Sequence, residues 1–179
     1  MGLSVVAGLL VLVLVITTAF TIWSVRRAFP DYGGEVELPR LQAEVDVVRD
    51  EHGIPHIYAD TAEDLFRAQG YVHAQDRFWE MDFRRHVTAG RLSELFGESQ
   101  VETDMFIRTL GWRDVAEREL PLLAPSTRRY LQAYADGVNA WLSSRSGGER
   151  GLAYTLLGLT GGENSPRRWA AADSLAWLK

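Results

Sequence analysis

The sequence predicts an α+β protein that is mostly helical, contains one β-hairpin and is preceded by a transmembrane helix. Three observations lead to this class. Residues 3–25 carry no charged side chain, although the chain contains 19 Lys+Arg and 24 Asp+Glu. Residues 43–59 alternate polar and β-branched positions on both sides of a turn, which is typical of paired strands. After residue 60, apolar side chains recur every three or four positions, as they do on a helix face.

These patterns divide the chain into three parts. Residues 1–25 form a hydrophobic membrane anchor or signal segment, residues 26–42 a linker, and residues 43–179 a domain. The linker contains Pro30 and the pair Gly33-Gly34, which are turn signals. The chain is 46% hydrophobic and 11% aromatic, a composition that favours a folded domain over disorder.

The hydrophobic run from Leu3 to Val25 is long enough to cross a membrane. At 1.5 Å per residue, a helix of this length spans the hydrocarbon layer of roughly 30 Å. Trp23 and the pair Arg26-Arg27 suit the membrane interface at its end. A cleaved signal peptide is the alternative, but the run lacks a basic start and an Ala-x-Ala site, so we expect an uncleaved anchor. Taken alone, Arg26 and Arg27 would place the domain in the cytoplasm.

The domain begins with an expected β-hairpin. Its strands are Ala43–Val48 and Ile54–Ala59, and the turn is Asp50–Gly53. Pro55 cannot donate a ladder hydrogen bond, so it belongs at a strand start or at a sheet edge.

Helices are expected over most of the remaining domain. The first begins near residue 61, where Asp60 or Thr61 can cap it, and ends near Gly90. The others are a short turn at Leu92–Phe96, a helix at Met105–Leu120, a helix capped by Ser126 that ends at Ser146-Gly147-Gly148, and Ala171–Lys179 with Asp173 near its start. Residues 161–166 are expected to form a loop. Because the last helix opens with an apolar pattern and the sequence then stops, we expect the chain to be a fragment.

Composition and motifs exclude several kinds of function. The net charge of −5 argues against a nucleic-acid-binding protein, because phosphate binding requires clustered positive charge. The absence of Cys excludes disulfides, thiolate zinc sites and a cysteine nucleophile. The sequence contains no Gly-x-Ser-x-Gly, Ser-x-x-Lys or P-loop motif.

Two groups of polar residues could carry chemistry, but each has a simpler explanation. His52 and His56 fall in the predicted hairpin without a metal-binding pattern. The carboxylates Asp76, Glu80 and Asp82 alternate with arginines, and we interpret them as helix ion pairs worth a few tenths of a kcal/mol each.

A third polar group lies among aromatic residues at the middle of the same helix. His73, Gln75, Asp76 and Arg77 favour a buried polar network, with contact to a substrate as the alternative. The residues alone therefore identify no catalytic and no metal-binding residue.

Several motifs, in order, resemble the α-chain of the penicillin acylase family. They cover the hairpin, the first long helix and its end, part of the helix capped by Ser126 and the C-terminal stretch: residues 47–59, 69–82, 84–85, 90–97, 134–141 and 166–176. The resemblance extends from about Ala43 to Lys179.

The resemblance implies part of an αββα N-terminal-nucleophile hydrolase. Such enzymes are made as one precursor that cleaves itself into α and β chains, and the new N-terminal Ser of the β-chain attacks a linear amide. The family's catalytic Ser, its acyl-pocket residues and its α-chain calcium ligand would lie beyond Lys179. We therefore assign no catalytic, metal or pocket residue here, and only Tyr71 is considered as a pocket neighbour. Calcium is possible in the full-length enzyme, and no cofactor is expected in this fragment.

The resemblance also implies partners and a location. The expected partners are the missing β-chain, the membrane through residues 3–25 and an N-acyl small-molecule substrate. The domain is expected to be membrane-anchored outside the cytoplasm, although Arg26 and Arg27 taken alone would place it in the cytoplasm. The fragment alone is expected to be inactive and poorly folded, with Phe78, Trp79, Phe83, Trp141 and Trp177 on faces normally covered by the β-chain. The alternative is a noncatalytic membrane-tethered binding module.

Overall fold

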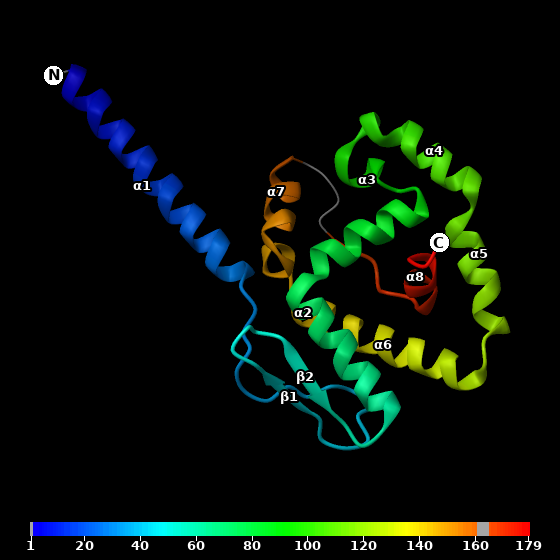
Figure 1. Ribbon diagram of the computed structural model, residues 1–179. Helices are drawn as coiled ribbons and strands as arrows, with labels where there is room; N and C mark the ends of the chain where they lie inside the picture. Colours follow the sequence, from blue (N-terminus) through cyan, green and yellow to red (C-terminus); the bar gives the residue numbers. More distant parts are fainter. Residues whose placement is uncertain (1, 161–164) are drawn as a thin grey trace.

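The computed structural model describes residues 2–160 and 165–179, which form a helical body with a small sheet and a projecting N-terminal helix (Figure 1). The elements are α1 (Gly2–Ala28), β1 (Asp46–Arg49), β2 (Pro55–Tyr58), α2 (Ala62–Ala89), α3 (Ser93–Phe96), η1 (Glu98–Gln100), α4 (Val101–Leu110), α5 (Trp112–Glu119), η2 (Leu120–Leu122), α6 (Pro125–Ser144), η3 (Gly147–Arg150), α7 (Leu152–Thr160) and α8 (Ala171–Ala176). The mostly helical architecture with one hairpin confirms the predicted combination of helices and a two-stranded sheet.

The N-terminal helix α1 extends away from the body and is uncharged until its last turn. It is long and apolar enough to cross a membrane from Ser4 to Ala28, three residues past the predicted end. Both a signal sequence and a membrane anchor have these properties.

The two strands form an antiparallel hairpin in which Asp46 lies opposite Tyr58 and Arg49 opposite Pro55. Each strand has four residues, fewer than predicted. The turn is held by the Asp50 carboxylate, which accepts hydrogen bonds from the amides of His52 and Ile54, both at 2.9 Å. Val48 and Tyr58 remain 55% and 62% exposed, so the described residues do not cover the face of the sheet that carries them.

Helix α2 begins and ends where local signals predict. Thr61 has an extended backbone, and its hydroxyl accepts a hydrogen bond from the amide of Asp64 at 3.1 Å. Gly90 adopts the left-handed conformation, with φ 61°, that commonly ends helices. Arg77 departs from helical geometry (φ −151°, ψ 38°), which places a kink in the middle of α2 that the sequence did not predict.

Two predictions for the later helices are wrong. The single helix expected at Met105–Leu120 is two helices, α4 and α5, because Gly111 between them adopts a left-handed conformation with φ 68°. Ser126 does not cap α6, which starts at Pro125 without a side-chain cap. Proline suits this position because the first helical amides need no intrahelical acceptor.

Helix α7 was not predicted at all. It precedes the expected loop at 161–166, of which residues 161–164 lie outside the described residues. The C-terminal helix α8 does form where expected, and the Asp173 carboxylate accepts a hydrogen bond from the amide of Ala170 at 2.7 Å.

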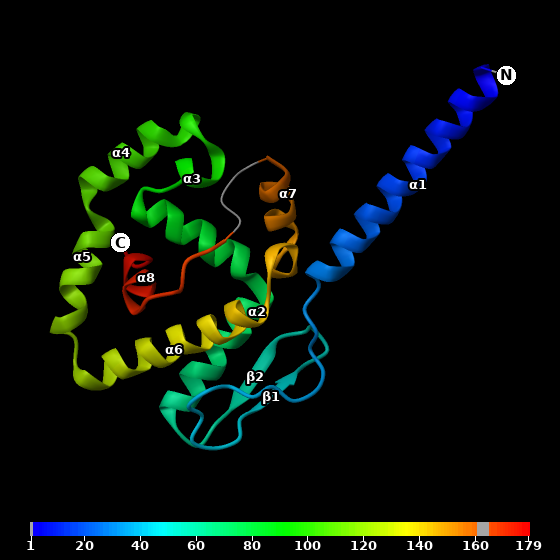
Figure 2. The ribbon, with the colours of Figure 1, turned by 180° about the vertical axis from the view of Figure 1, so that it is seen from behind.

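The centre of the body is the crossing of α2 and α6, which pack at backbone contact. A Cβ atom at Gly70 would lie 2.9 Å from the carbonyl carbon of Tyr134, and one at Gly137 would lie 2.9 Å from the amide nitrogen of Tyr71. Helices α4 and α5 run along the outer edge, and α8 lies between α5 and this crossing (Figure 2).

The aromatic core lies between α2, α6 and α7. The ring of Phe78 is 5.2 Å from that of Trp141 and 6.1 Å from that of Tyr154. The expectation that Phe78 and Trp141 need the β-chain to cover them is wrong, because they are only 2% and 3% exposed. Trp177, in contrast, is 39% exposed.

Candidate functional site

A buried ion-pair cluster joins α2, α7 and α8. Asp82 and Arg85 form an ion pair while only 1% and 3% of their side chains are exposed. The Tyr154 hydroxyl donates a hydrogen bond to Asp82 at 2.7 Å. Arg85 also lies 3.9 Å from the Asp173 carboxylate and donates to the carbonyl of Arg167 at 2.9 Å. Every charged member of the cluster therefore has an oppositely charged neighbour, as buried charges require.

The cluster extends outward through both of its carboxylates. Asp173 also pairs with Arg113 of α5, and Arg113 in turn donates to Glu117 at 2.9 Å. On the other side, His86 Nδ1 lies 3.5 Å from the Asp82 carboxylate and 2.7 Å from the Asp82 backbone carbonyl. The cluster thus connects α2, α5, α7 and α8.

Glu80 and Asp82 form ion pairs within helix α2, as predicted, whereas Asp76 does not. Glu80 and Arg77 do form an exposed pair, at 3.9 Å. Asp82 is buried, and Asp76 pairs instead with Arg49 of β1, at 2.7 Å. The spacing of three residues between Asp82 and Arg85 is the same for exposed and buried pairs, so the sequence does not distinguish them.

The predicted polar network of His73, Gln75, Asp76 and Arg77 does not form as one unit. His73 lies 3.1 Å from the Tyr134 hydroxyl, and Arg77 points to solvent. Gln75 donates to the carbonyl of Asp31 at 2.7 Å, while Asp76 binds Arg49. Gln75 and Asp76 therefore fasten the linker and the hairpin to α2, which is a structural role.

Burial changes the acidity of the aromatic side chains near these groups. It raises the pKa of Tyr134 to about 12, and it raises the pKa of Tyr71. The pKa of His73 is lowered, mainly by burial and next by the charge of Arg77. His73 is therefore favoured in its neutral form, which suits its contact with Tyr134.

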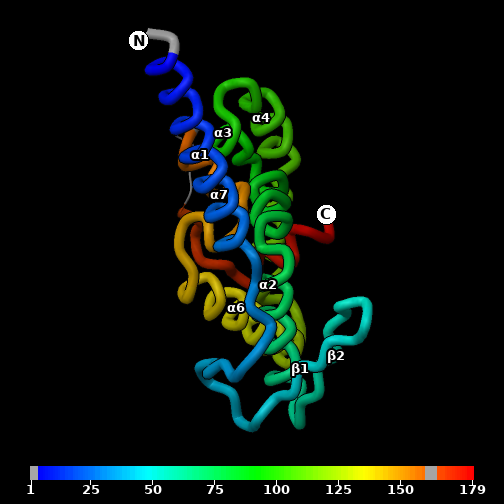
Figure 3. The backbone as a smooth tube through the Cα atoms, turned by 90° about the vertical axis from the view of Figure 1, so that its left-hand side faces the viewer, coloured from blue at the N-terminus to red at the C-terminus, as the bar shows by residue number. Residues whose placement is uncertain are grey.

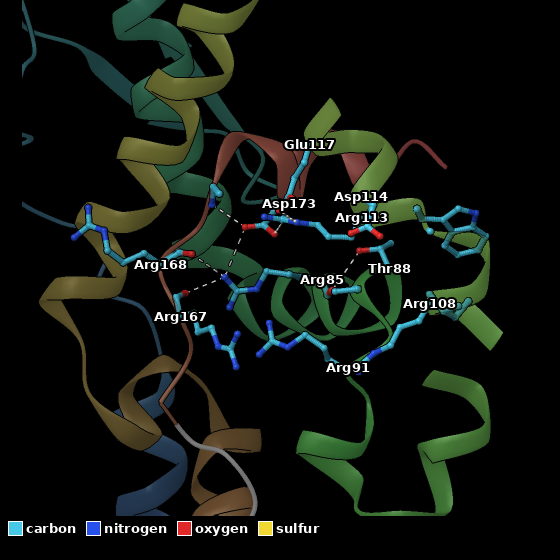
Figure 4. A pocket seen from close by; sticks show the side chains of 15 residues that line it. Arg85, Thr88, Arg91, Arg108, Arg113, Asp114, Glu117, Arg167, Arg168 and Asp173 are labelled. Carbon is cyan, nitrogen blue, oxygen red and sulfur yellow. Dashed lines mark hydrogen bonds and ion pairs between the residues drawn. The ribbon is translucent and has the colours of Figure 1, made fainter. Parts of the chain in front are cut away.

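Next to the ion-pair cluster lies a pocket of about 510 Å³ that is rich in arginine (Figure 4). The charged residues that line it are Arg85, Arg91, Arg108, Arg113, Arg167, Arg168, Asp114, Glu117 and Asp173. Guanidinium groups bind carboxylates and phosphates through paired hydrogen bonds. The dashed contacts in Figure 4 show this chemistry used internally, with Arg85 and Arg113 converging on Asp173.

A second pocket, of about 540 Å³, is mainly apolar and lies between α2, α6 and α8. The apolar and aromatic residues that line it are Phe66, Met81, Tyr130, Leu131, Tyr134, Trp169, Trp177 and Leu178. Tyr71, the one pocket neighbour considered from the sequence, lies elsewhere: it lines a cavity of about 550 Å³ beneath the linker.

The described residues do not supply a metal site. Within residues 2–160 and 165–179, no three His, Asp or Glu side chains come together to hold an ion. His56 lies 3.4 Å from Asp50, and His52 lies 3.7 Å from Glu51, both at the surface of the hairpin. The described residues therefore offer no set of ligands for the calcium ion that the resemblance implies for the complete enzyme.

Comparison with known proteins identifies the family. The sequence model of the penicillin amidase family matches residues 44–179. The chain is 37% identical over 156 residues to penicillin acylase 2 proenzyme from Pseudomonas sp. (strain SE83), covering 87% of this chain and 19% of that protein. It is also 37% identical over 134 residues to penicillin G acylase from Escherichia coli, covering 73% and 15%.

Two further matches agree. Acyl-homoserine lactone acylase QuiP from Pseudomonas aeruginosa is 36% identical over 115 residues, with 64% of this chain and 14% of that protein covered. A solved structure of penicillin G acylase from Alcaligenes faecalis superposes with a TM-score of 0.61 at 27% identity, covering 75% of this chain and 70% of that one. The chain thus spans less than a fifth of the curated relatives' length, and it belongs to the penicillin amidase family.

Proposed function

We propose that this chain is the N-terminal, α-chain part of an exported amidohydrolase of the penicillin acylase type, which hydrolyses the linear amide bond of N-acyl compounds. The observation that carries the proposal is the family match over residues 44–179, which takes in every element of the domain from β1 to α8. Candidate substrates are acylated β-lactams and acyl-homoserine lactones, because relatives named for both kinds of compound match this chain.

In this proposal the nucleophile is supplied by a second chain. A precursor cleaves itself, and the freed N-terminal Ser attacks the amide carbonyl while its own α-amino group acts as the base. An oxyanion hole stabilises the tetrahedral intermediate. One matching relative is named a proenzyme, which is consistent with such processing.

The residues of this chain have a supporting role in that mechanism. The cluster of Asp82, Arg85 and Asp173 fixes α2 against α8. The uncovered hairpin and the apolar pocket between α2, α6 and α8 offer surfaces for the second chain. Calcium in the complete enzyme would be held by residues outside this chain.

We further propose that α1 holds the enzyme in the membrane with the domain outside the cytoplasm. The length and composition of α1 support an anchor. Two arginines are a weak determinant of topology when a large domain follows.

Amine release by the complete protein tests the proposed activity. The full reading frame and the chain 1–179 alone would each be purified and incubated with a penicillin, an acyl-homoserine lactone and an N-acyl amino acid. We expect the complete protein to release a primary amine from at least one of them and the chain alone to release none.

Two results would contradict the proposal. Release by the isolated chain would place the nucleophile within residues 1–179. A complete, folded protein that binds these compounds without cleaving them would favour a noncatalytic membrane-tethered binding module.

A further inference from the structure

Helix α7 presents a leucine face to the outside of the body. Leu152, Leu156 and Leu159 are 43%, 57% and 67% exposed, and their spacing of four and three residues puts them on one side of the helix. The opposite side carries Tyr154 and Leu157, which are 1% and 7% exposed and belong to the core. The helix contains no charged residue. A continuous apolar face of this kind indicates a partner other than water.

This helix is fixed against the end of α1 at which the domain begins. Figure 1 and Figure 3 show α7 beside that end, and α1 contacts both η3 and α7. Gly148 of η3 marks the close approach, because a Cβ atom there would lie 3.5 Å from Arg27 Nε of α1 and 3.5 Å from Cβ of Thr155 in α7. Ser24 of α1 is 3% exposed at the same junction. The position of α7 is therefore set relative to the point where α1 would leave the membrane.

The side chains around this junction suit the headgroup layer of a membrane. The Arg27 guanidinium lies 4.4 Å from the centre of the Trp23 ring, and Trp and Arg are both favoured at the interface. Hydrogen bonds from Ser146, followed by the charges of Arg27 and Arg145, lower the pKa of Glu149. Arg27 and Arg145 thus place positive charge near Glu149, and anionic lipid headgroups attract such charge.

We propose that α7 lies in the membrane interface, with its three leucines at the boundary between headgroups and acyl chains, and that it holds the domain close to the lipid surface beside α1. Helices at a membrane surface bury an apolar face at the boundary between headgroups and acyl chains. The opposite face of α7 is covered by the core of the domain. The inference rests on the proposed retention of α1 as an anchor. A spanning helix alone leaves the domain free to rotate and tilt, whereas a second contact fixes which face of the domain meets the lipid.

The test uses a fluorescent label at the leucine face. The chain has no cysteine, so the complete protein, with any cysteine outside these residues replaced by serine, can be labelled with the environment-sensitive dye NBD at L159C. The matched control is L122C, which replaces a leucine that is 82% exposed in η2. Helix η2 follows α5, which lies on the opposite side of the body from α1 (Figure 1). Both proteins are reconstituted into vesicles of phosphatidylcholine containing some phosphatidylglycerol.

We expect the label at position 159 to show blue-shifted emission, quenching by doxyl-labelled lipid and protection from aqueous iodide. The label at position 122 should show the opposite pattern. A protein that floats with the vesicles but whose label at 159 is quenched by iodide would overturn the inference while leaving the anchor intact. Protection from both quenchers would also overturn it, because the face would then be covered by protein. A protein that does not float with the vesicles would refute the anchor itself, and with it this inference.

Discussion

Replacing Asp82 by asparagine is expected to lower the free energy of unfolding of the complete protein by about 3–5 kcal/mol, the usual cost of removing one partner of a buried ion pair. Arg85 would keep its buried positive charge and, among the described residues, retain only Asp173, at 3.9 Å, as an oppositely charged partner. The asparagine NH2 group would replace one acceptor oxygen and would therefore face either Arg85 or Tyr154, each of which donates to a different oxygen of Asp82. Urea unfolding followed by circular dichroism measures the change.

The matched control is Glu80→Gln in the same helix. Glu80 is 50% exposed and pairs with Arg77 at 3.9 Å, so its substitution should change stability by no more than about 0.5 kcal/mol. If Asp82→Asn and Glu80→Gln have equally small effects, the buried cluster does not hold α2, α7 and α8 together.

Replacing Gly137 by alanine is expected to destabilise the protein, although alanine normally stabilises a helix interior relative to glycine. The new Cβ atom would overlap the backbone of α2, lying 2.9 Å from the carbonyl carbon of Arg67 and 2.9 Å from the amide nitrogen of Tyr71. Helices α2 and α6 would have to separate, at a cost of about 1–3 kcal/mol or more.

A loss of stability in Gly137→Ala, where alanine would normally increase stability, identifies the backbone contact between α2 and α6. Gly33→Ala serves as control, because its Cβ atom would meet only the Asp31 side chain, at 3.7 Å. Thermal unfolding should show a clear decrease in the midpoint for Gly137→Ala and little change for Gly33→Ala. A higher midpoint for Gly137→Ala would mean that the two backbones are not in contact.

The elements that were predicted correctly are those with local signals. Helix α2 has a capping residue at Thr61 and a glycine at its end, and the hairpin has an Asp50–Gly53 turn between alternating strands. The break at Gly111 was missed because an isolated glycine can also be tolerated within a helix. Helix α7 was missed because its apolar run lacks a polar face, and only the packing of Tyr154 against α2 shows which side is buried.

The ion-pair cluster could not be predicted because its members are distant in sequence. Asp82 meets Tyr154 72 residues later, and Arg85 meets the carbonyl of Arg167 82 residues later. Each residue looks like an ordinary surface residue in its own segment. The spacing of Asp82 and Arg85 identified the pair but gave no information about its burial.

N-terminal sequencing of the purified complete protein, combined with intact-mass measurement, tests most directly whether this chain belongs to a two-chain amidohydrolase with an N-terminal nucleophile. We expect two polypeptides, one containing residues 44–179 and one beginning with serine. Substitution of that serine by alanine should abolish amine release. Two results would contradict the proposal of an N-terminal serine nucleophile. One is a single uncleaved polypeptide that still hydrolyses N-acyl compounds, and the other is a second chain that does not begin with serine.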